Sequence, residues 1–504
     1  MIILDGNSLD LNNFIKVSRY NEKVSISEES VKLVNKASKF VQSVVESELP
    51  VYGINTGFGK LSDVSINKCD VSELQKNLLM SHACGVGAMF SEEIVRGMMV
   101  LRINALIKGY SGIRIKTLNK LVELLNKGVI PVVFEKGSLG ASGDLAPLSH
   151  MSLPIIGLGE VTYKGERMDT MVAFNKLGIE PIVKLKAKEG LSLINGTQAM
   201  TSVGAITLYD AFRLYKLSNI SLSMTVEATN GIIDAFDPRV HSVRGQLGQI
   251  EAAKEILINL EGSSYTTKQG EMRMQDAYSI RCSPQVHGAT LDALNFVKEK
   301  VEIEMNAVTD NPIVFTDDGI AISAGNFHGE PLAMPFDYLG IAISEMGSIS
   351  ERRIERMVNP SLSNGLPAFL VTNPGINSGF MIVQYSAASL VSENKVLAHP
   401  SSVDSIPSSA NQEDHVSMGT IGARKASSIL ENVSNVIAME IFTACQAIDL
   451  RGKRKLGNKT EKAYNKVREY IPFISNDEIM YKHIHKVNDL VKNEELFKAI
   501  FEEE

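Results

Sequence analysis

Apolar residues recur at helical spacing along most of the chain. Over residues 27–47 they fall on one face, at Val31, Val34, Val41, Val44 and Val45. Ser25 and Glu28 have the spacing of a capping box just ahead of this face. Residues 117–127 repeat the pattern with four leucines, and Gly128 followed by Pro131 is a typical helix stop. Both segments are predicted to be amphipathic helices.

Long segments with few helix breakers follow residue 200. They span residues 202–229, 287–306, 336–358, 378–397 and 413–448, and a helix is predicted for each. Several are apolar on all sides, which indicates burial at the centre of a bundle or against a partner subunit. Strand patterns are confined to short hairpin pieces at Val161–Tyr163 and Ile313–Phe315.

These patterns predict a mainly helical fold in two parts. Residues 1–200 form a smaller, mixed N-terminal part that carries a glycine-rich loop. Residues 201–504 form a bundle of long helices with a C-terminal helical tail. The tail is rich in Lys and Glu from about residue 452, and we expect it to be an exposed helical end.

Composition narrows the possible partners and the compartment. The net charge is -7 and no basic stripe is evident, which argues against a nucleic-acid partner. Four cysteines without a CxxC pair are typical of a reducing compartment rather than of a disulfide framework or a zinc site. The N-terminus has no pattern of a signal peptide, and no apolar run reaches the length of a membrane span. We therefore expect a cytoplasmic protein that binds neither membrane nor nucleic acid.

The run Gly137–Pro147 contains a tripeptide, Ala141-Ser142-Gly143, that can become an electrophile. If the Gly143 nitrogen attacks the Ala141 carbonyl and two waters leave, the backbone closes into a five-membered ring. Ser142 then becomes a dehydroalanine within a methylidene-imidazolone. Only a residue without a Cβ lets its nitrogen approach so closely, which makes glycine the suitable third residue.

A second glycine-rich loop, Tyr52–Gly59, has neither phosphate-binding fingerprint. Lys60 is followed by Leu61 rather than Ser or Thr, and no third glycine completes a GxGxxG. Its tyrosine is a candidate base. For Tyr52 to act near pH 7, its pKa would have to fall from about 10 to about 7, which requires about 4 kcal/mol of differential stabilisation.

Gln275, Tyr278 and Arg281 recur at three-residue spacing and are expected to share one helical face. Arg281 suits a substrate carboxylate, because a guanidinium binds it with two charge-assisted hydrogen bonds. Other charged groups are given no site. Arg352, Arg353 and Arg356 are interpreted as a solvated or inter-subunit face, and His483 with His485 as an exposed pair rather than a metal site.

Several motifs together resemble the aromatic amino-acid ammonia-lyase family. They occur in order from Tyr52 to Arg451, at Tyr52–Gly59, Gly137–Pro147, Leu193–Gln198, Gln275–Gln285, Gly325–Pro331 and Ser392–Met418. The sequence departs from the family pattern at Ala277, where Pro is usual, and at Ser283, where Gln is usual. The resemblance implies an elongated helical bundle of the fumarase and aspartase superfamily, assembled as a homotetramer whose sites are shared between subunits. It also implies an autocatalytic 4-methylidene-imidazol-5-one formed from Ala141, Ser142 and Gly143, with no external cofactor and no metal.

The resemblance further implies the roles of individual residues. Tyr52, Ser142 and Tyr278 would be catalytic. The substrate-binding residues would be His82, Asn195, Gln275, Arg281, Phe327 and Glu413. Asn195 would bond the cofactor ring or the substrate amine, and Phe327 would lie beside the ring.

Two of these residues indicate the substrate. His82 follows Ser81, and Glu413 stands in a Gln-Glu-Asp-His run; both contexts are typical of the histidine-specific branch of the family. The expected reaction is the non-oxidative deamination of L-histidine to trans-urocanate, the first step of histidine degradation. A phenylalanine or tyrosine lyase, an aminomutase with the same cofactor, and an inactive structural homologue remain alternatives.

Overall fold

A computed structural model describes residues 1–47, 51–57 and 66–502. It begins with β1 (Ile2–Leu4), α1 (Leu11–Ser18), β2 (Val24–Ile26) and α2 (Glu28–Ser47). β1 and β2 pair in parallel. The predicted capping box is wrong by two residues: Ser25 lies within β2, and the amide of Ser30 instead donates to Ser27 Oγ at 3.1 Å. Ser27 directly precedes α2, so its hydroxyl is the one placed to cap the first turn.

The two compact units of the chain are each built from separate segments. The first unit comprises residues 1–206, 298–337 and 400–424, and the second comprises residues 207–297, 338–399 and 425–504. The fold is mainly helical, as the sequence pattern predicts.

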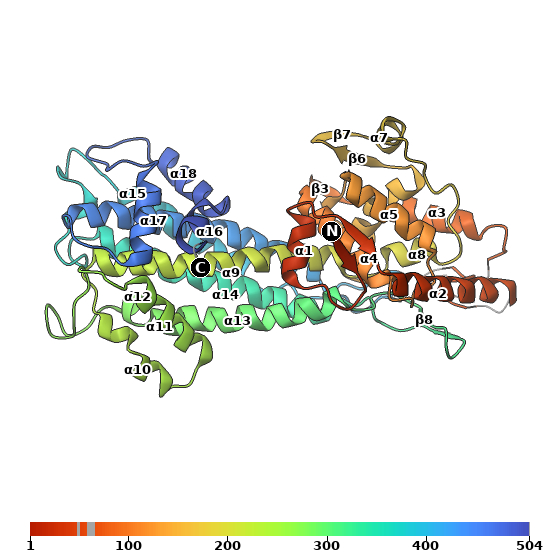
Figure 1. Cartoon of the computed structure of the whole chain (residues 1–504), viewed down its shortest axis with the longest axis horizontal. Coiled ribbons are helices and arrows are strands. Elements are labelled where there is room, and N and C mark those ends of the chain that lie inside the picture. Colours follow the sequence, from red (N-terminus) through yellow and green to blue (C-terminus); the bar gives the residue numbers. More distant parts are fainter. Residues whose placement is uncertain (48–50, 58–65, 503–504) are drawn as a thin grey trace. The chain divides into compact units, whose positions relative to one another are not determined.

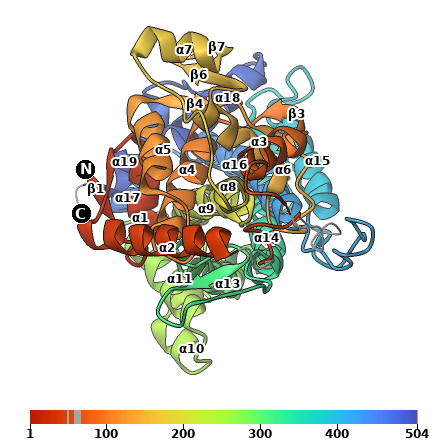
Figure 2. The same ribbon diagram turned by 90° about the vertical axis from the view of Figure 1, so that its right-hand side faces the viewer.

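The first unit combines short helices with small sheets. Its remaining short helices are α3 (Val71–His82), α4 (Glu92–Leu106), α5 (Ile115–Lys127), α6 (Leu145–Ser152), the 3-10 turn η2 (Leu153–Ile156), α7 (Thr170–Leu177) and α8 (Glu189–Ile194). The leucine face of α5 is buried, and Gly128 ends the helix in a left-handed conformation, as predicted. Figure 2 shows α5 between α2 and the strands β4, β6 and β7.

Three antiparallel sheets complete this unit. β3 (Val86–Met89) pairs with β5 (Phe134–Lys136), while β4 (Val129–Pro131), β6 (Glu160–Tyr163) and β7 (Glu166–Asp169) form a three-stranded sheet. β8 (Ile313–Phe315) and β9 (Ile320–Ile322) form a hairpin. Both predicted hairpin pieces are therefore confirmed, and the sheets remain small.

The five long helices are confirmed, although their ends differ from the predicted ones by up to six residues. They are α9 (Gln198–Ala228), α13 (Ser283–Met305), α14 (Glu330–Val358), α15 (Met381–Leu397) and α16 (Gly419–Leu450). α16 begins at Gly419 rather than at the predicted residue 413. The amides of Ser417 and Met418 donate to the carbonyl oxygens of Gly140 and Leu139, both at 3.3 Å, so this segment bonds another loop instead of a helical turn.

The second unit packs these long helices around a buried carboxylate. Within it, α9, α13, α14 and α16 run side by side (Figure 1), and Glu440 of α16 binds Arg353 of α14 through both carboxylate oxygens. Both side chains are fully buried. The prediction that Arg353 belongs to a solvated or inter-subunit face is therefore wrong, because its partner lies in the core of its own unit.

The smaller helices of the second unit enclose this core. They are η3 (Ile233–Phe236), α10 (Pro238–Ser242), α11 (Leu247–Asn259), α12 (Tyr278–Arg281), η4 (Ala368–Leu370), α17 (Asn458–Arg468), α18 (Met480–Lys492) and α19 (Glu495–Phe501). The tail is helical, as expected, but part of its surface is buried. Val467, Val487 and Leu490 are buried, so its helices each present an apolar face to the unit.

α16 alone among the described helices has the length and apolar composition of a membrane span. Its most apolar window is 83% buried inside the protein. A core helix of a bundle has the same composition, so this helix is explained by its packing.

Candidate active site

A buried aspartate fixes the loop that carries the Ala-Ser-Gly tripeptide. Asp144 accepts hydrogen bonds from Ser138 Oγ at 2.7 Å, from the Met200 amide at 2.8 Å and from Thr420 Oγ1. Burial raises the pKa of this carboxyl, and these donors oppose the rise. The loop is thereby tied to α9 and to the start of α16, and α6 begins directly after it.

The tripeptide itself is packed on both sides. Ala141 contacts Val416 and Met418 in a small apolar cluster. Gly143 has a φ of +75°, and a Cβ at this position would lie 2.2 Å from the Gly196 carbonyl oxygen. Only glycine therefore fits the third position without displacing the neighbouring loop.

Asn195 joins this loop from the end of α8. Its Nδ2 donates to the Ser142 carbonyl oxygen at 2.9 Å. The side chain is only 2% exposed, and its backbone leaves the helix at φ -91° and ψ 83°. Helix termination therefore directs this amide at the tripeptide.

Glu413 approaches the same serine from the loop before α16. Ser142 Oγ donates to Glu413 Oε1 at 3.0 Å, and Ser408 Oγ donates to Glu413 Oε2 at 3.2 Å. Reciprocal backbone bonds between Ser408 and Glu413 close the loop, at 2.9 and 3.2 Å. Glu413 is thus placed by an irregular segment and not by the helix predicted for it.

His82 is the last residue of α3. Its Nδ1 lies 3.0 Å from Ser81 Oγ, and the Gly85 amide just beyond donates to His150 Nε2 at 3.0 Å. Burial lowers the pKa of His82, while the negative charge of Glu413 acts in the opposite direction. The imidazole is therefore predominantly neutral near pH 7.

A cavity of about 920 Å³ brings these groups together. Among the residues proposed from the sequence, it is lined by Tyr52, His82, Ser142, Asn195, Phe327 and Glu413. All six belong to the first unit. Phe58 and Gly59, which end the glycine-rich loop of Tyr52, lie outside the described residues.

Gln275, Tyr278 and Arg281 are not among the residues that line this cavity, and they belong to the second unit. The shared helical face predicted for them is wrong. α12 covers only Tyr278–Arg281, and the preceding Asp276 is bound by the Ile232 amide at 2.6 Å and by Arg273. These bonds hold Gln275 in a loop. The Arg281 guanidinium lies 4.5 Å from the centre of the exposed Tyr278 ring.

Sequence reasoning missed several residues of the cavity wall, among them Ser81, Leu191, Asn311 and Gln412. Asn311 stands in an Asp-Asn-Pro run, which by itself indicates only a turn. His483 Nε2 lies 3.0 Å from Glu478 Oε2, but no group of three potential metal ligands occurs among residues 1–47, 51–57 and 66–502.

Comparison with known proteins agrees with this geometry. The model of the family described as aromatic amino acid lyase matches residues 9–469. A protein of Clostridium tetani named histidine ammonia-lyase is 57% identical over 99% of this chain and 97% of its own length. The crystal structure of histidine ammonia-lyase from Trypanosoma cruzi is 41% identical, with a TM-score of 0.92 over 99% of this chain and 94% of that one. Tyrosine aminomutase of Streptomyces globisporus is 35% identical, with a TM-score of 0.96 over 100% and 98%.

The family model matches most of the chain, and the two histidine ammonia-lyases are similar to it over nearly the full sequence. The chain belongs to the aromatic amino acid lyase family.

Proposed function

We propose that the chain removes ammonia from L-histidine without oxidation and releases trans-urocanate, the first step of histidine degradation. The observation that carries this proposal is the meeting of Ser142, His82 and Glu413 at one cavity. The similarity to the histidine ammonia-lyase of Clostridium tetani extends over nearly the whole chain and supports the same substrate.

The cofactor of the proposal is a 4-methylidene-imidazol-5-one made from Ala141, Ser142 and Gly143, so that no external cofactor or metal is needed. Ring closure joins the Gly143 nitrogen to the Ala141 carbonyl carbon, with the loss of two waters. The loop fits such a ring, because the close approach of Gly143 to Gly196 leaves no room for a Cβ. When present, the group supplies an electrophilic carbon at Ser142 that takes up the substrate amine.

Asn195 and Phe327 support the tripeptide from the cavity wall. Asn195 Nδ2 donates to the Ser142 carbonyl oxygen, and a donor in this position favours negative charge on that oxygen. Phe327 lines the same cavity and provides a flat apolar surface next to the reacting groups.

His82 and Glu413 bind the imidazole of the substrate. A carboxylate accepts a hydrogen bond from a ring N–H, and the neutral His82 can donate or accept. Tyr52 at the same cavity removes the β-proton of the substrate. When the imidazole and the carboxylate of the substrate are both bound, the β-proton and its base are held within reach of each other.

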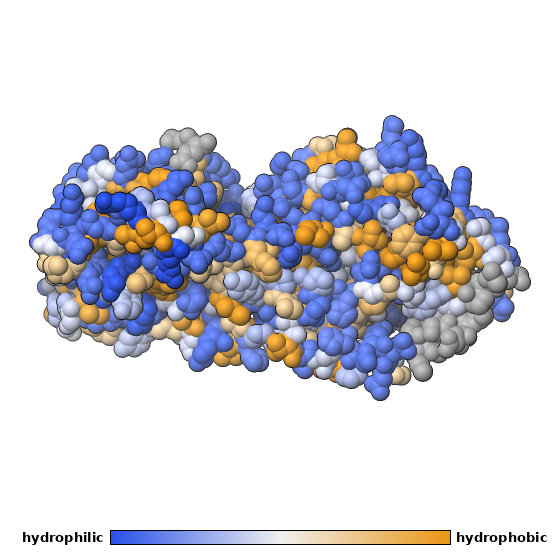
Figure 3. Space-filling model, turned by 90° about the horizontal axis from the view of Figure 1, so that it is seen from below, coloured by the Kyte–Doolittle hydropathy of each residue, from blue (hydrophilic) through white to orange (hydrophobic). Residues whose placement is uncertain are grey.

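Gln275, Tyr278 and Arg281 serve a site on another copy of the chain, with Arg281 binding the substrate carboxylate and Tyr278 assisting proton transfer. An aromatic ring that is 70% exposed and stacked by an arginine is typical of an interface residue. We assign a homotetramer with sites shared between subunits. Exposed Phe296, Tyr338 and Ile341 on the long helices, and the hydrophobic patches on the face in Figure 3, support association.

A cytoplasmic location is part of this proposal, and two observations support it. α16, the apolar helix, is accounted for by burial within the protein. The net charge of -7 disfavours binding to nucleic acid or to an anionic membrane.

The test is a spectrophotometric assay of urocanate with purified protein and L-histidine, paired with the intact mass of the chain. We expect urocanate and a mass deficit of two waters. Ser142→Ala should fold, keep its full mass and lose nearly all turnover. Ser152→Ala is the matched control, because its hydroxyl bonds only the Leu148 carbonyl within α6. A folded Ser142→Ala variant with full turnover would contradict the proposal.

Two alternatives remain open to the same assay. Because the chain is similar to a tyrosine aminomutase, the assay is also run with L-phenylalanine and with L-tyrosine as substrates. A mass deficit without urocanate, but with cinnamate or coumarate as the product, would indicate a phenylalanine or tyrosine lyase. A β-amino acid as the product would indicate an aminomutase. An unmodified chain without activity would indicate a structural homologue.

A further inference from the structure

A buried ion pair lies behind the wall of the cavity. Lys188 Nζ is 2.5 Å from Asp310 Oδ2, and the two side chains are 0% and 2% exposed. Lys188 Nζ also donates to Ser192 Oγ at 3.2 Å. Neither charged residue lines the cavity itself. Since a buried pair of this kind adds little net stability compared with apolar side chains, its position suggests a different role.

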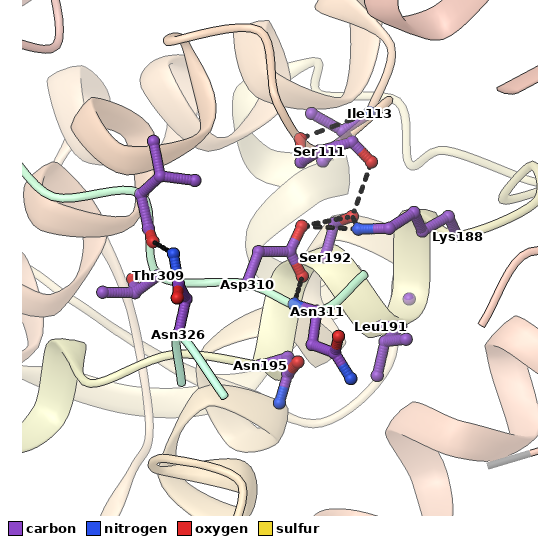
Figure 4. A network of polar contacts seen from close by, with 12 residues as sticks. Ser111, Ile113, Lys188, Leu191, Ser192, Asn195, Thr309, Asp310, Asn311 and Asn326 are labelled. Atoms are coloured by element: carbon purple, nitrogen blue, oxygen red, sulfur yellow. Dashed lines mark hydrogen bonds and ion pairs between the residues drawn. The ribbon is translucent and has the colours of Figure 1, made fainter. Parts of the chain in front are cut away.

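The pair joins two segments that each carry an amide of the cavity wall. Lys188 directly precedes α8, and Asn195 directly follows it. Asp310 precedes Asn311, and its Oδ1 accepts a hydrogen bond from the Asn311 amide at 2.8 Å. Figure 4 shows Lys188, Ser192 and Asp310 converging, with Asn195 and Asn311 on the other side of Asp310 from Ser111.

A second buried cation spans the same segments. Arg102 donates to the carbonyl oxygens of Ser192, Asn195 and Thr309, at 2.8, 3.1 and 2.7 Å. Burial lowers the pKa of Arg102 to about 10, and the charge of Asp310 opposes this. Arg102 and Lys188 therefore link the segment of α8 to the segment of residues 309–310, on the side away from the cavity.

Lys188 itself adopts a conformation that a lysine rarely takes. Its φ is +65°, in the left-handed region that disfavours residues with a Cβ. A strained backbone with a buried charge persists where the surrounding structure holds it. Here the Asp310 carboxylate and Ser192 hydroxyl hold it, which sets the start of α8 and the direction of its end.

We propose that the Lys188–Asp310 pair positions Asn195 against the Ser142 carbonyl, and that ring closure and turnover depend on this placement. Both are positioning residues that act through Asn195, because neither touches the cavity. The inference rests on the proposed function. A side chain that is held by a satisfied buried network keeps its geometry better than one that is held by apolar packing alone.

The deciding variant is the double substitution Lys188→Met with Asp310→Leu, which removes both charges and leaves neither unpaired. We expect this variant to fold, with the two-water mass deficit in fewer than half of its molecules. We expect its kcat for L-histidine to fall at least tenfold, while KM changes less than threefold. A folded double variant with the full mass deficit and a kcat within threefold of wild type would overturn the inference.

If the double variant does not fold, a conservative variant at Lys188 tests the positioning role. Lys188→Arg keeps the charge but alters the geometry at Asp310, and we expect a kcat at least tenfold lower. A wild-type kcat would overturn the inference. Arg353→Lys is the matched control at a buried ion pair of the other unit, and it should keep the mass deficit and kcat.

Measurements on the wild-type chain distinguish a failure of the proposed function from a failure of the positioning role. If wild type shows neither the mass deficit nor urocanate, the proposed function fails and the inference fails with it. If wild type shows both and the variants match it, only the positioning role is overturned.

Discussion

Gly143 occupies a position that no other residue fills without strain. Its φ is +75°, and the Gly196 carbonyl oxygen lies where a Cβ would be placed. The Asp144 amide next to it donates to that same oxygen at 2.7 Å. The loops of residues 137–144 and 195–198 are therefore in backbone contact, and the smallest residue at the crossing determines how closely they approach.

Gly143→Ala should abolish the two-water mass deficit and markedly lower stability, because the methyl group forces the two loops apart. Gly128→Ala is a matched control: its φ is also positive, at +67°, but nothing lies within 4 Å of the added Cβ. We expect the control to lose about 1 kcal/mol from the left-handed backbone alone and to keep its mass deficit. Intact-mass and urea-unfolding measurements on both variants check this.

At the scale of elements, helices in the second unit are joined through Glu440. Ser221 and Thr225 of α9 donate to its carboxylate at 2.9 and 2.7 Å, and Ser350 and Arg353 of α14 donate as well. One carboxylate on α16 therefore satisfies donors from two neighbouring helices. Loss of its charge leaves the guanidinium of Arg353 buried without a counter-ion.

Glu440→Gln should lower the free energy of unfolding by about 3–5 kcal/mol, the usual penalty for breaking a buried pair from one side. Glu431→Gln on the same helix is the control, because its partner Lys492 and Glu431 itself are 43% and 65% exposed. We expect the control to lose less than about 1 kcal/mol. Equal midpoints of chemical unfolding for the two variants would show that the buried network contributes nothing.

Element boundaries show where sequence patterns reach their limit. The periodicity of α5 and its Gly128 stop were sufficient to predict that helix. The start of α16 was not predictable, because residues 413–418 bond the loop of residues 139–140, which is distant in sequence. The same limit applies to Arg353, whose burial depends on a glutamate 87 residues away.

The acid stability of the molecule depends on histidines that folding keeps neutral. Complete burial lowers the pKa of His287 well below 6.5, and the positive charge of Arg353 lowers it further. The unfolded chain therefore binds a proton at this histidine more readily than the folded one as the pH falls below about 6.5. Stability contributed by the neutral form is present at pH 7 and is lost on acidification.

A His287→Gln variant should show a shallower loss of stability with acid than wild type. Between pH 7.5 and pH 5.5 we expect wild type to lose about 1 kcal/mol more than the variant, because only wild type carries this titrating group. Urea unfolding at the two pH values measures the difference, and the contributions of all other groups cancel in the comparison. Parallel losses in both proteins would assign the acid sensitivity to other residues.

The sequence by itself determined the helical class, the long helices and six polar or aromatic residues of the candidate site. Helical periodicity and glycine stops are local properties, and the Ala-Ser-Gly run with its neighbouring motifs is visible without a fold. Six residues proposed from those motifs line one cavity. The motifs were informative because each combines residue types suited to the same chemistry.

Only the tertiary structure decided which of these groups meet and what holds them. The contacts of Ser142 with Asn195 and Glu413 span 53 and 271 residues, and the Lys188–Asp310 pair spans 122. Such contacts follow from packing between distant segments, so no local pattern encodes them. Burial is likewise a property of the whole fold. The sequence does not distinguish Lys188 from the exposed lysines of the chain, whereas the structure shows that its side chain is buried.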